Sequence, residues 1–472
     1  MRLPGRGGRQ PGVAHDESLT GEGDPVRSLA LAAALLGTLA GPAAAATPPV
    51  RHVFTIVLEN ESATTTFGPN SPAPYLSQTL RAQGAYLPNY HAIGHQSNDN
   101  YIAMVSGQAP NVETQADCPV YVDLPSGPLG AYGQAQGQGC VYPATVPTIA
   151  SQLQGAGLTW SDYNEGMGAD PAREAPQCGH PGIDTQDNTQ RATSSDEYAG
   201  RHNPFVYFHS IIDDTALCDS NVVNLDALPR DLRHAANTPN YVFITPDLCD
   251  DGHDSPCKNG ERGGLGQADS FLRTWVPRIT HSPAFLEQNG LLMVLFDEAS
   301  TSETSSCCGE IAGPGSPLPG VTGPGGGDTG AVLLSPCIAP GTVTQTPYNH
   351  YSMLRSVEDL FGLSRLGYAQ LPGETSFGAD VFTRRCGPPP KVRIRARVAG
   401  SHIRIGWRAR GAPVAYFVVQ VRVDGKRWRT LLRRTRRHDV DVRARRGRRY
   451  RFRARAVEPS GTYSRWATAR SR

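Results

Sequence analysis

Residues 52–60 read HVFTIVLEN and residues 290–298 read GLLMVLFDE. In each stretch an unbroken apolar run ends abruptly at an acidic residue with a polar neighbour. A continuous apolar run of this length is typical of a strand buried on both faces, as the strands of a parallel sheet are. Two further runs have the same form, YVFIT at 241–245 and AVLL at 331–334. These four segments are therefore the predicted core strands.

Helical patterns separate the predicted strands. They lie at 75–83, 98–106, 266–279 and 350–361. Strands that alternate with helices favour an α/β fold in which a mostly parallel sheet is sandwiched by helices. In such sheets ligands gather beyond the carboxyl ends of the strands, where loops from separate strands converge. The polar residues that end the runs are therefore the first candidates for a site.

The charge distribution divides the chain. Residues 388–472 hold 26 Lys and Arg against 4 Asp and Glu, whereas residues 1–387 hold 19 against 39. A Pro-rich linker at 387–390 separates the two parts, and we predict a catalytic domain at 47–386 and a basic domain at 391–472. The basic domain alternates apolar residues with arginines, as in VRIRARV and YRFRARAV, which predicts a β-sandwich. Trp407, Tyr450 and the segment from Gly461 to Trp466 make it similar to a fibronectin type III domain.

The amino-terminal segment and the cysteines both indicate export. Residues 28–46 form an apolar, alanine-rich run that ends in small residues, so we predict a leader and signal peptide over 1–46. The run is too short to predict a membrane span. All ten cysteines lie between Cys118 and Cys386, and an even number in an exported chain favours disulfides. The pairs predicted from proximity are Cys249–Cys257, Cys118–Cys140 and Cys178–Cys218.

The polar pairs Glu59-Asn60 and Asp297-Glu298 follow two predicted strands whose ends should meet in space. Oxygen donors of this kind hold one divalent metal cation such as Mg²⁺, Ca²⁺ or Mn²⁺, and added histidine would admit Zn²⁺ or iron. Carboxylates at strand ends are also common as helix caps. The sequence leaves both interpretations open.

Ser97 is the candidate nucleophile. It lies in the segment NYHAIGHQSNDNYIAMVSG at 89–107, directly before a predicted helix. A hydroxyl at a helix amino terminus lies where backbone N–H groups favour a phosphate or an oxyanion. An ordinary helix cap is the alternative for a serine at this position. His95, two residues earlier, is a candidate catalytic residue.

Three further histidines are candidates. His202 and His253 lie in polar segments near predicted element ends, where either could bind phosphate or donate a proton to a leaving oxygen. His350 begins a predicted helix, where capping competes with a catalytic role. A structural or solvated histidine is the alternative at each position.

Taken in order along the chain, these segments resemble the bacterial phosphoesterase family that includes acid phosphatases, phosphatidylinositol-3-phosphate phosphatases and phospholipases C. The matching elements are VLEN (57–60), PYL (74–76), HQSNDNYIAMVSG (95–107), HNPF (202–205), NYVFITPDLCDDGHD (240–254), FDE (296–298), LLSP (333–336) and NHYSMLRSVEDLFGL (349–363). The resemblance implies an alkaline-phosphatase-like fold. It also implies a metal bound by residues matching Glu59, Asn60, Ser97, Asp297 and Glu298, with Ser97 as the nucleophile.

The segment around Ser97 departs from the commoner family form H-P-S-x-P-N-Y. Gln96 and Asp99 stand where that form has proline, whereas His95, Ser97, Asn100 and Tyr101 match it. Because both prolines are absent, the backbone conformation around Ser97 does not follow from the commoner family form.

We expect a secreted or cell-envelope-associated, metal-dependent phosphomonoesterase that acts through a phosphoserine. The candidate substrates are phosphate monoesters or phospholipids, phosphatidylinositol 3-phosphate among them. A phospholipase C-type phosphodiesterase is the first alternative, and a non-catalytic cell-surface binding protein is the second. The basic domain would contact an anionic surface through charge, with no specific nucleic acid expected. A solvated spacer is the alternative for that domain.

Overall fold

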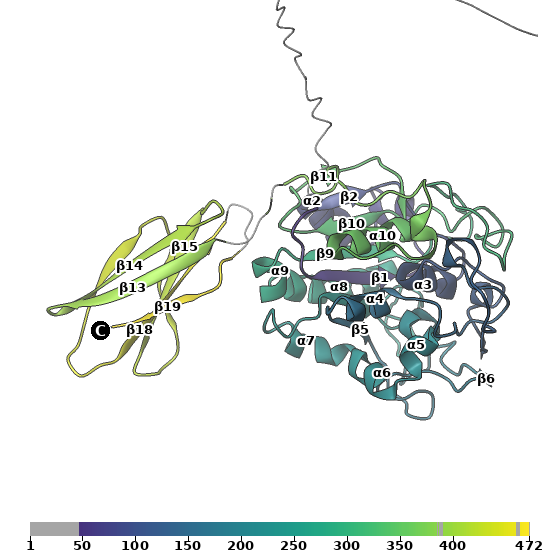
Figure 1. The fold of residues 1–472 in the computed structure, drawn as a ribbon, viewed down its shortest axis with the longest axis horizontal. Coiled ribbons are helices and arrows are strands. Elements are labelled where there is room, and N and C mark those ends of the chain that lie inside the picture. Colours follow the sequence, from purple (N-terminus) through teal and green to yellow (C-terminus); the bar gives the residue numbers. More distant parts are fainter. Residues whose placement is uncertain (1–46, 385, 387–389, 459–462, 472) are drawn as a thin grey trace, which may run out of the picture. The chain divides into compact units, whose positions relative to one another are not determined.

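The computed structural model describes residues 47–384, 386, 390–458 and 463–471, so the predicted signal peptide lies outside the described residues. An eight-stranded sheet forms the centre of the larger domain, in the order β11-β2-β10-β9-β1-β8-β5-β7 (Figure 1). The predicted core strands are β1 (Val53–Leu58), β8 (Tyr241–Thr245), β9 (Leu291–Phe296) and β10 (Ala331–Leu334). The remaining strands are β2 (Ala85–Leu87), β5 (Trp160–Asn164), β7 (Val222–Asn224) and β11 (Thr342–Val343).

The sheet is mostly parallel, as predicted, but β10 is antiparallel to its neighbours β9 and β2. The strands β9, β1, β8, β5 and β7 run parallel to one another. All four residues of β10 are buried. A strand buried on both faces has the same apolar run whether it is parallel or antiparallel to its neighbours. The apolar run therefore predicts a core strand but not the direction of that strand. The residues that follow β10 consequently lie at the opposite edge from those that follow β1 and β9.

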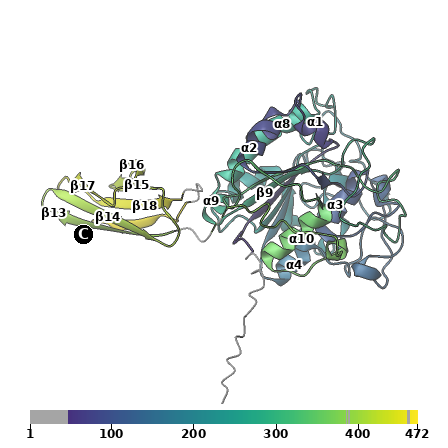
Figure 2. The same ribbon diagram turned by 90° about the horizontal axis from the view of Figure 1, so that it is seen from above.

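Helices cover both faces of this sheet (Figure 2). Val53 and Val57 of β1 pack in one apolar cluster with side chains of α3 and α10, whereas Phe54 and Ile56 pack in the other with side chains of α8. Alternate residues of a strand point to opposite faces, so a strand that is apolar throughout needs cover on both sides. The sandwiched architecture follows from the uninterrupted apolar runs.

The four predicted helices are confirmed. They correspond to a π-helical turn at Tyr75–Leu80 continued by α2 (Arg81–Gln83), and to α3 (Ser97–Ser106), α8 (Leu265–Thr280) and α10 (His350–Phe361). The other helices are short: α1 (Ala63–Phe67), α4 (Ile149–Gly155), α5 (His209–Ile212), α6 (Thr215–Asn221), α7 (Leu228–Asp231) and α9 (Pro283–Glu287). Two-residue strands β3 (Tyr90–His91) and β12 (Tyr348–Asn349) pair in parallel, and β4 (Val120–Tyr121) pairs with β6 (Thr185–Gln186).

All ten cysteines form disulfides. The three predicted pairs, Cys118–Cys140, Cys178–Cys218 and Cys249–Cys257, are confirmed. The other two are the adjacent residues Cys307 and Cys308, and Cys337 with Cys386. Five disulfides in one chain are typical of a protein that folds in an oxidising compartment.

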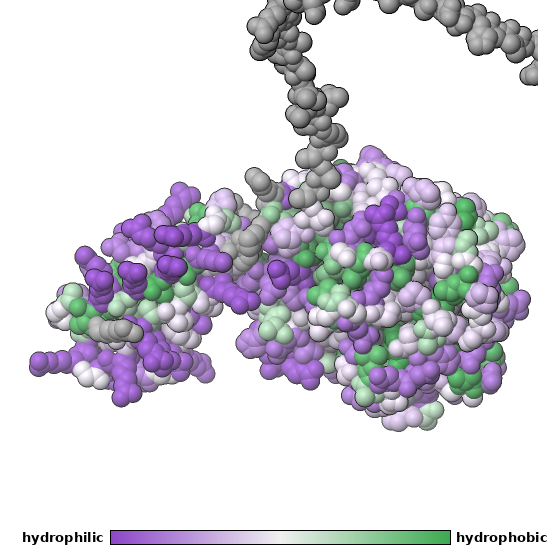
Figure 3. Space-filling view, in the orientation of Figure 1, coloured by the Kyte–Doolittle hydropathy of each residue, from purple (hydrophilic) through white to green (hydrophobic). Residues whose placement is uncertain are grey.

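The smaller domain is a β-sandwich, as predicted. One sheet has the order β13 (Lys391–Ala399), β14 (His402–Arg410), β17 (Asp439–Arg443). The other has the order β16 (Arg429–Thr435), β15 (Tyr416–Val423), β18 (Tyr450–Val457), β19 (Ala467–Arg470). Trp407, Phe417 and Phe452 lie in its core. Hydrophilic side chains, purple in Figure 3, project from the visible face of this domain. Among the described residues no helix has the length and apolarity that crossing a bilayer requires.

Candidate active site

The two acidic pairs lie together at the carboxyl ends of β1 and β9, which are neighbours in parallel register. The main-chain N–H of Asn60 donates to Oδ1 of Asp297 at 3.1 Å, and the N–H of Glu298 donates to the same oxygen at 2.6 Å. Glu59 and Asp297 are fully buried. Residues separated by more than 230 positions thus form one acidic cluster at this edge of the sheet.

Asn60 turns the chain sharply after β1. Its φ is 60°, in the left-handed region that asparagine adopts more readily than most residues. The side-chain Nδ2 of Asn60 donates to Oε2 of Glu59 at 3.2 Å. Unusual backbone conformations of this kind often occur at functional sites, because neighbouring contacts must hold them in place. The turn therefore places the amide of Asn60 against the carboxylate that precedes it.

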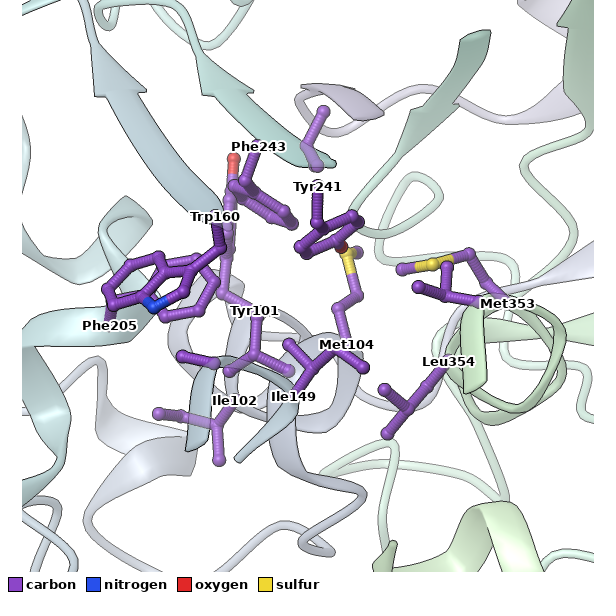
Figure 4. Packing of buried hydrophobic residues seen from close by; sticks show 14 of the residues in the cluster. Tyr101, Ile102, Met104, Ile149, Trp160, Phe205, Tyr241, Phe243, Met353 and Leu354 are labelled. Carbon is purple, nitrogen blue, oxygen red and sulfur yellow. The ribbon is translucent and has the colours of Figure 1, made fainter. Parts of the chain in front are cut away.

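Ser97 is the first residue of α3, and Gln96 rather than Ser97 occupies the cap position. The hydroxyl of Ser97 donates to Oε2 of Glu59 at 2.9 Å and is almost completely buried. The helix is fixed by Tyr101 and Met104, which pack in the apolar cluster beneath the sheet (Figure 4). The capping interpretation is therefore wrong for Ser97, because its hydroxyl points into the acidic cluster.

His202 lies between two of the acidic residues. Its Nε2 is 3.5 Å from Oε2 of Glu59, and its Nδ1 is 3.2 Å from Oδ2 of Asp251. The ring of Tyr101 stacks on the imidazole at a centroid distance of 5.2 Å, and its hydroxyl donates to Oε1 of Glu59 at 2.8 Å. The buried group of Glu59, His202 and Asp251 could hold a metal ion, since all three ligand atoms lie within 4.8 Å of one another.

Burial dominates the protonation of this cluster. It raises the pKa of Glu59, Asp251 and Glu298 well above the ordinary range, and neighbouring carboxyl groups raise these values further. Burial also raises the pKa of Asp297 to about 6. It lowers the pKa of His202 well below the ordinary value, and Arg201 and His253 add to that effect. Carboxyl groups crowded in this way become ionised readily only beside a positive charge.

Several ligand atoms in the cluster have no hydrogen-bond partner among the described residues. They are Oδ2 of Asp297 and Oε2 of Glu298, while the ring nitrogens of His202 and Oδ2 of Asp251 have only the contacts at 3.2 and 3.5 Å given above. Buried polar atoms are nearly always satisfied, and oxygens with imidazole nitrogens form the donor set of a divalent cation. The residues present therefore fit a metal ion.

Arg201 and His253 form a second group beside the cluster. The rings of His202 and His253 are 6.1 Å apart, and Nη2 of Arg201 lies 3.1 Å from Nε2 of His253. The other ring nitrogen of His253 lies 2.8 Å from Oδ1 of Asp254. Burial and Arg201 lower the pKa of His253, and Asp254 opposes them. This group supplies a cation and a partly exposed imidazole next to the acidic residues.

Two predicted residues shape the turn that leads to Ser97. Oδ1 of Asn100 accepts from the N–H groups of Ile93 and Gly94 at 2.9 and 3.0 Å, and its Nδ2 donates to the carbonyls of Gly94 and Gln96 at 2.9 Å each. Asn100 therefore fixes the turn from within. Nε2 of His95 lies 2.6 Å from the carbonyl oxygen of Glu303, so this nitrogen contacts the long loop 301–328.

Asp99, which stands where the commoner family form has proline, is buried against Gly94. A Cβ on Gly94 would lie 2.4 Å from Oδ2 of Asp99, so only glycine leaves room for this carboxyl group. The turn before Ser97 consequently depends on Gly94 and Asn100, with no proline on either side of the nucleophile.

His350 contacts the backbone of a predicted metal ligand. Its Nε2 lies 2.6 Å from the carbonyl oxygen of Asp297, and its Nδ1 lies 3.1 Å from the hydroxyl of Tyr90. Burial lowers its pKa to about 4. Asn349, not His350, caps α10 by accepting from the N–H of Ser352. His350 therefore positions the loop that carries Asp297.

Three residues of the site were not predicted: Asp117, Arg201 and Asp251. Asp117 accepts from the N–H of Asn98 at 3.0 Å and lies 3.8 Å from Nε of Arg201. Arg201 and Asp251 each stand within two residues of a predicted histidine in the sequence, which is the one signal that could have indicated them. Asp117 carried no such signal.

A family model described as the Phosphoesterase family matches residues 59–364. The match covers more than half of the chain and includes every predicted site residue. The chain therefore belongs to the Phosphoesterase family, and the predicted family resemblance is confirmed.

Relatives within this class are distant. A probable acid phosphatase of Kluyveromyces lactis is 26% identical over 318 residues, which are 67% of this chain and 59% of that protein. A phosphatidylinositol-3-phosphatase of Mycobacterium tuberculosis is 27% identical over 349 residues, 72% of this chain and 88% of that protein. An acid phosphatase of Aspergillus fumigatus is 24% identical over 289 residues, 61% and 51% respectively. The chain thus spans little more than half the length of the two fungal relatives.

Solved structures are more remote. A phosphonate monoester hydrolase from Silicibacter pomeroyi superposes with a TM-score of 0.37 and 10% identity, covering 73% of this chain and 79% of that one. An Fn3-like protein from Clostridium thermocellum has a TM-score of 0.15 and 16% identity, covering 18% and 93%. These scores are too low to bear on function.

Proposed function

We propose that the chain is a metal-dependent phosphomonoesterase that acts through a phosphoserine at Ser97. The observation that carries this proposal is the 2.9 Å hydrogen bond from the Ser97 hydroxyl to Glu59, inside an acidic cluster with unpartnered ligand atoms. Glu59, Asn60, Ser97, Asp297 and Glu298 would hold one divalent cation. When bound, such a cation lowers the pKa of a hydroxyl that it coordinates and neutralises phosphoryl charge.

The chain's own residues supply the remaining steps. Ser97 Oγ attacks phosphorus in line with the leaving oxygen, and its proton passes to the carboxylate of Glu59. The bond from phosphorus to the leaving alcohol breaks, and His253 in its protonated form, oriented by Asp254, donates a proton to the departing oxygen once the leaving group has replaced Arg201 beside Nε2. Arg201 stabilises charge on the phosphoryl oxygens. Water then attacks the phosphoserine and gives a proton to His253, the bond from phosphorus to Ser97 Oγ breaks, and Glu59 returns its proton to that oxygen, so that two displacements give net retention at phosphorus.

The contacts of the other predicted site residues favour different roles for them. His202 contacts Glu59 and Asp251, which favours a role beside the cation. The contacts of His95 with Glu303, of Asn100 with the turn and of His350 with Asp297 favour positioning roles for these three residues.

The domain limits and the location of the chain are part of the proposal. We place the catalytic domain at 47–386, the linker at 387–390 and the basic domain at 391–472. The five disulfides support secretion, since such bonds persist in oxidising compartments. The substrate would be a phosphate monoester, with phosphatidylinositol 3-phosphate as one candidate because a relative carries that activity in its name. The basic domain would contact an anionic partner.

The test measures hydrolysis of p-nitrophenyl phosphate, its choline phosphodiester analogue and phosphatidylinositol 3-phosphate by the purified chain. We expect monoester turnover that a chelator abolishes and that Ser97→Ala reduces at least about 10³-fold. Ser106→Ala, in the same helix with its hydroxyl bonded to Ile102, is the matched control and should keep activity.

Two results would contradict the proposal. Turnover of the diester alone would assign the chain to the phospholipase C type. Absence of turnover in every assay, with Ser97→Ala indistinguishable from the parent, would favour the non-catalytic binding protein.

A further inference from the structure

The sheet β13-β14-β17 presents a row of basic side chains on its outer face. Alternate residues of β13 and β14 are exposed, while the residues between them, such as Ile403 and Trp407, face the core. We call the outward row the basic ladder, and it consists of Lys391, Arg393, Arg395, Arg397, Arg404, Arg408 and Arg410.

The register of the two strands sets like charges directly against each other. Arg393 lies opposite Arg408, Arg397 lies opposite Arg404, and Lys391 lies opposite Arg410. Directly opposed like charges destabilise an antiparallel pair. The ladder therefore opposes the stability of its own sheet, which makes a solvated spacer a poor explanation for it.

Acidic residues neutralise little of the ladder. Within the described part of the chain, Arg404 alone in the ladder forms an ion pair, with Asp441 at 3.0 Å. The neighbouring strand β17, on the other side of β14 from β13, has Asp439, Asp441 and Arg443 exposed in the same outward row. The uncompensated positive charge is thus a strip two strands wide with acidic residues along one side.

Two arginines of the opposite sheet, Arg453 and Arg455, have aromatic partners, although Arg422, Arg451 and Arg470 of that sheet also lie opposite one another. The guanidinium of Arg453 lies 4.4 Å from the ring of Trp428 and 4.3 Å from that of Trp466, and Arg455 lies 3.9 Å from the ring of Tyr463. Cation–π contacts of this kind hold those guanidinium groups within the domain. The comparison separates Arg453 and Arg455, which stabilise the sandwich, from ladder arginines that have no such partner.

The length and width of the basic ladder suit an extended, chain-like ligand. Outward-facing positions recur about every 6.7 Å along each strand, with Gly406 in place of a basic residue on β14, and the two strands lie about 4.8 Å apart. Gly406, which lies opposite Arg395, has no side chain to fill the surface at this point. The concavity there has a volume of about 650 Å³. Arg395 and Arg408 line it.

From this arrangement we infer that the basic ladder binds a linear polyanion that carries phosphate groups at regular intervals. Planar guanidinium forks match phosphate oxygens, and a narrow chain can lie along β13, which is one strand farther than β14 from Asp441 and from Asp439, the carboxylate that lines one side of the concavity. A flat anionic membrane would meet those carboxylates as well. Ladder positions carry no exposed aromatic ring on which bases could stack, which single-stranded nucleic acids usually require. The choice of phosphate rests on the phosphoesterase function proposed for the larger domain.

The experiment titrates the full chain carrying Ser97→Ala with long-chain inorganic polyphosphate at several salt concentrations. Ser97→Ala prevents hydrolysis, so this titration measures binding alone. A failure of the binding inference can therefore be distinguished from a failure of the proposed catalytic function. We expect salt-dependent binding that the triple variant Arg393→Thr, Arg397→Thr, Arg408→Thr weakens at least about 10-fold, with a shallower salt dependence. The melting temperature of this variant should not fall, because the substitutions remove opposed like charges.

The matched control removes three exposed arginines elsewhere in the same domain. Arg429→Thr, Arg433→Thr, Arg446→Thr has the same net charge and should bind within about 3-fold of the parent. Equal weakening by both triple variants would overturn the inference, as would tighter binding to phosphatidylserine vesicles or to single-stranded DNA at equal phosphate concentration. Should the threonine variant unfold, the corresponding lysine variant keeps the charge, and full retention of binding by it would contradict the role of the guanidinium forks.

Discussion

The hydroxyl of Tyr101 donates a 2.8 Å hydrogen bond to Oε1 of Glu59, the carboxylate oxygen that the Ser97 hydroxyl does not contact. One carboxylate therefore receives two hydroxyl groups that stand four residues apart on α3. Residues separated by four lie on the same face of a helix, so the helix presents both groups to Glu59 together.

Tyr101→Phe should lower kcat about 10- to 100-fold, because loss of a hydrogen bond that orients a metal ligand typically costs that much in affinity or activity. The phenyl ring keeps its stacking on His202, so the melting temperature should change little. Steady-state kinetics with p-nitrophenyl phosphate at several metal concentrations measure the effect. Unchanged kcat at every metal concentration would refute the positioning role.

Removal of the metal should lower both activity and stability. A cation present at 1,000 times its dissociation constant stabilises the folded state by about 4 kcal/mol, so a chelator should lower the melting temperature by several degrees. Glu298→Gln should reduce this metal-dependent stabilisation, since it neutralises one proposed ligand. Differential scanning fluorimetry with and without EDTA gives the comparison. Equal melting temperatures in the two conditions would argue against a cation in the cluster.

Asp162 should make stability depend on pH. Burial at the centre of β5 raises the pKa of this carboxyl group from 3.8 to about 8, and Asn164 donates a 2.9 Å hydrogen bond to it. The folded chain binds this proton more tightly than the unfolded chain. The resulting stability is complete below about pH 4 and is lost progressively as the pH rises to about 8.

Asp162→Asn should remove that dependence. We expect the variant to match the parent near pH 4 and to exceed it by about 5 kcal/mol at pH 8. Urea unfolding followed by tryptophan fluorescence at both pH values measures the difference. A difference that stays constant between pH 4 and pH 8 would contradict this assignment.

The disulfides should differ in their contributions. Cys337 and Cys386 are 49 positions apart, whereas Cys249 and Cys257 are 8 apart. The chain-entropy relation gives about 4 kcal/mol for the longer loop and about 2.5 kcal/mol for the shorter one. Paired Cys→Ala variants compared by chemical unfolding should show this order. The reverse order would mean that interactions in the folded state outweigh the entropy of the unfolded chain.

Local patterns were sufficient for much of the fold. Apolar runs identified β1, β8, β9 and β10 because burial on both faces excludes polar residues from a strand. The direction of β10 could not be predicted in this way. The strand β5, WSDYN, was missed because its sequence contains the buried polar residues Ser161 and Asp162.

The residues of the candidate site also fall into two groups, those that a local sequence pattern indicated and those that it did not. Residue types at strand ends indicated Glu59 and Asp297, and the resemblance indicated Ser97. Asp117 and Arg201 belong to loops whose sequences carry no periodic signal, and their place beside Asn98 and His253 results from long-range packing. Interactions between residues distant in the chain leave no local pattern to detect.

The sequence by itself determined which segments are core strands, which polar residues end them and which domain carries the positive charge. Only the tertiary structure decided that the carboxylate of Glu59 is shared by Ser97, Tyr101 and His202, and that the arginines of β13 and β14 oppose one another. The physical reason is that burial and charge are properties of single residues, whereas strand direction, register and side-chain contact depend on how distant segments pack.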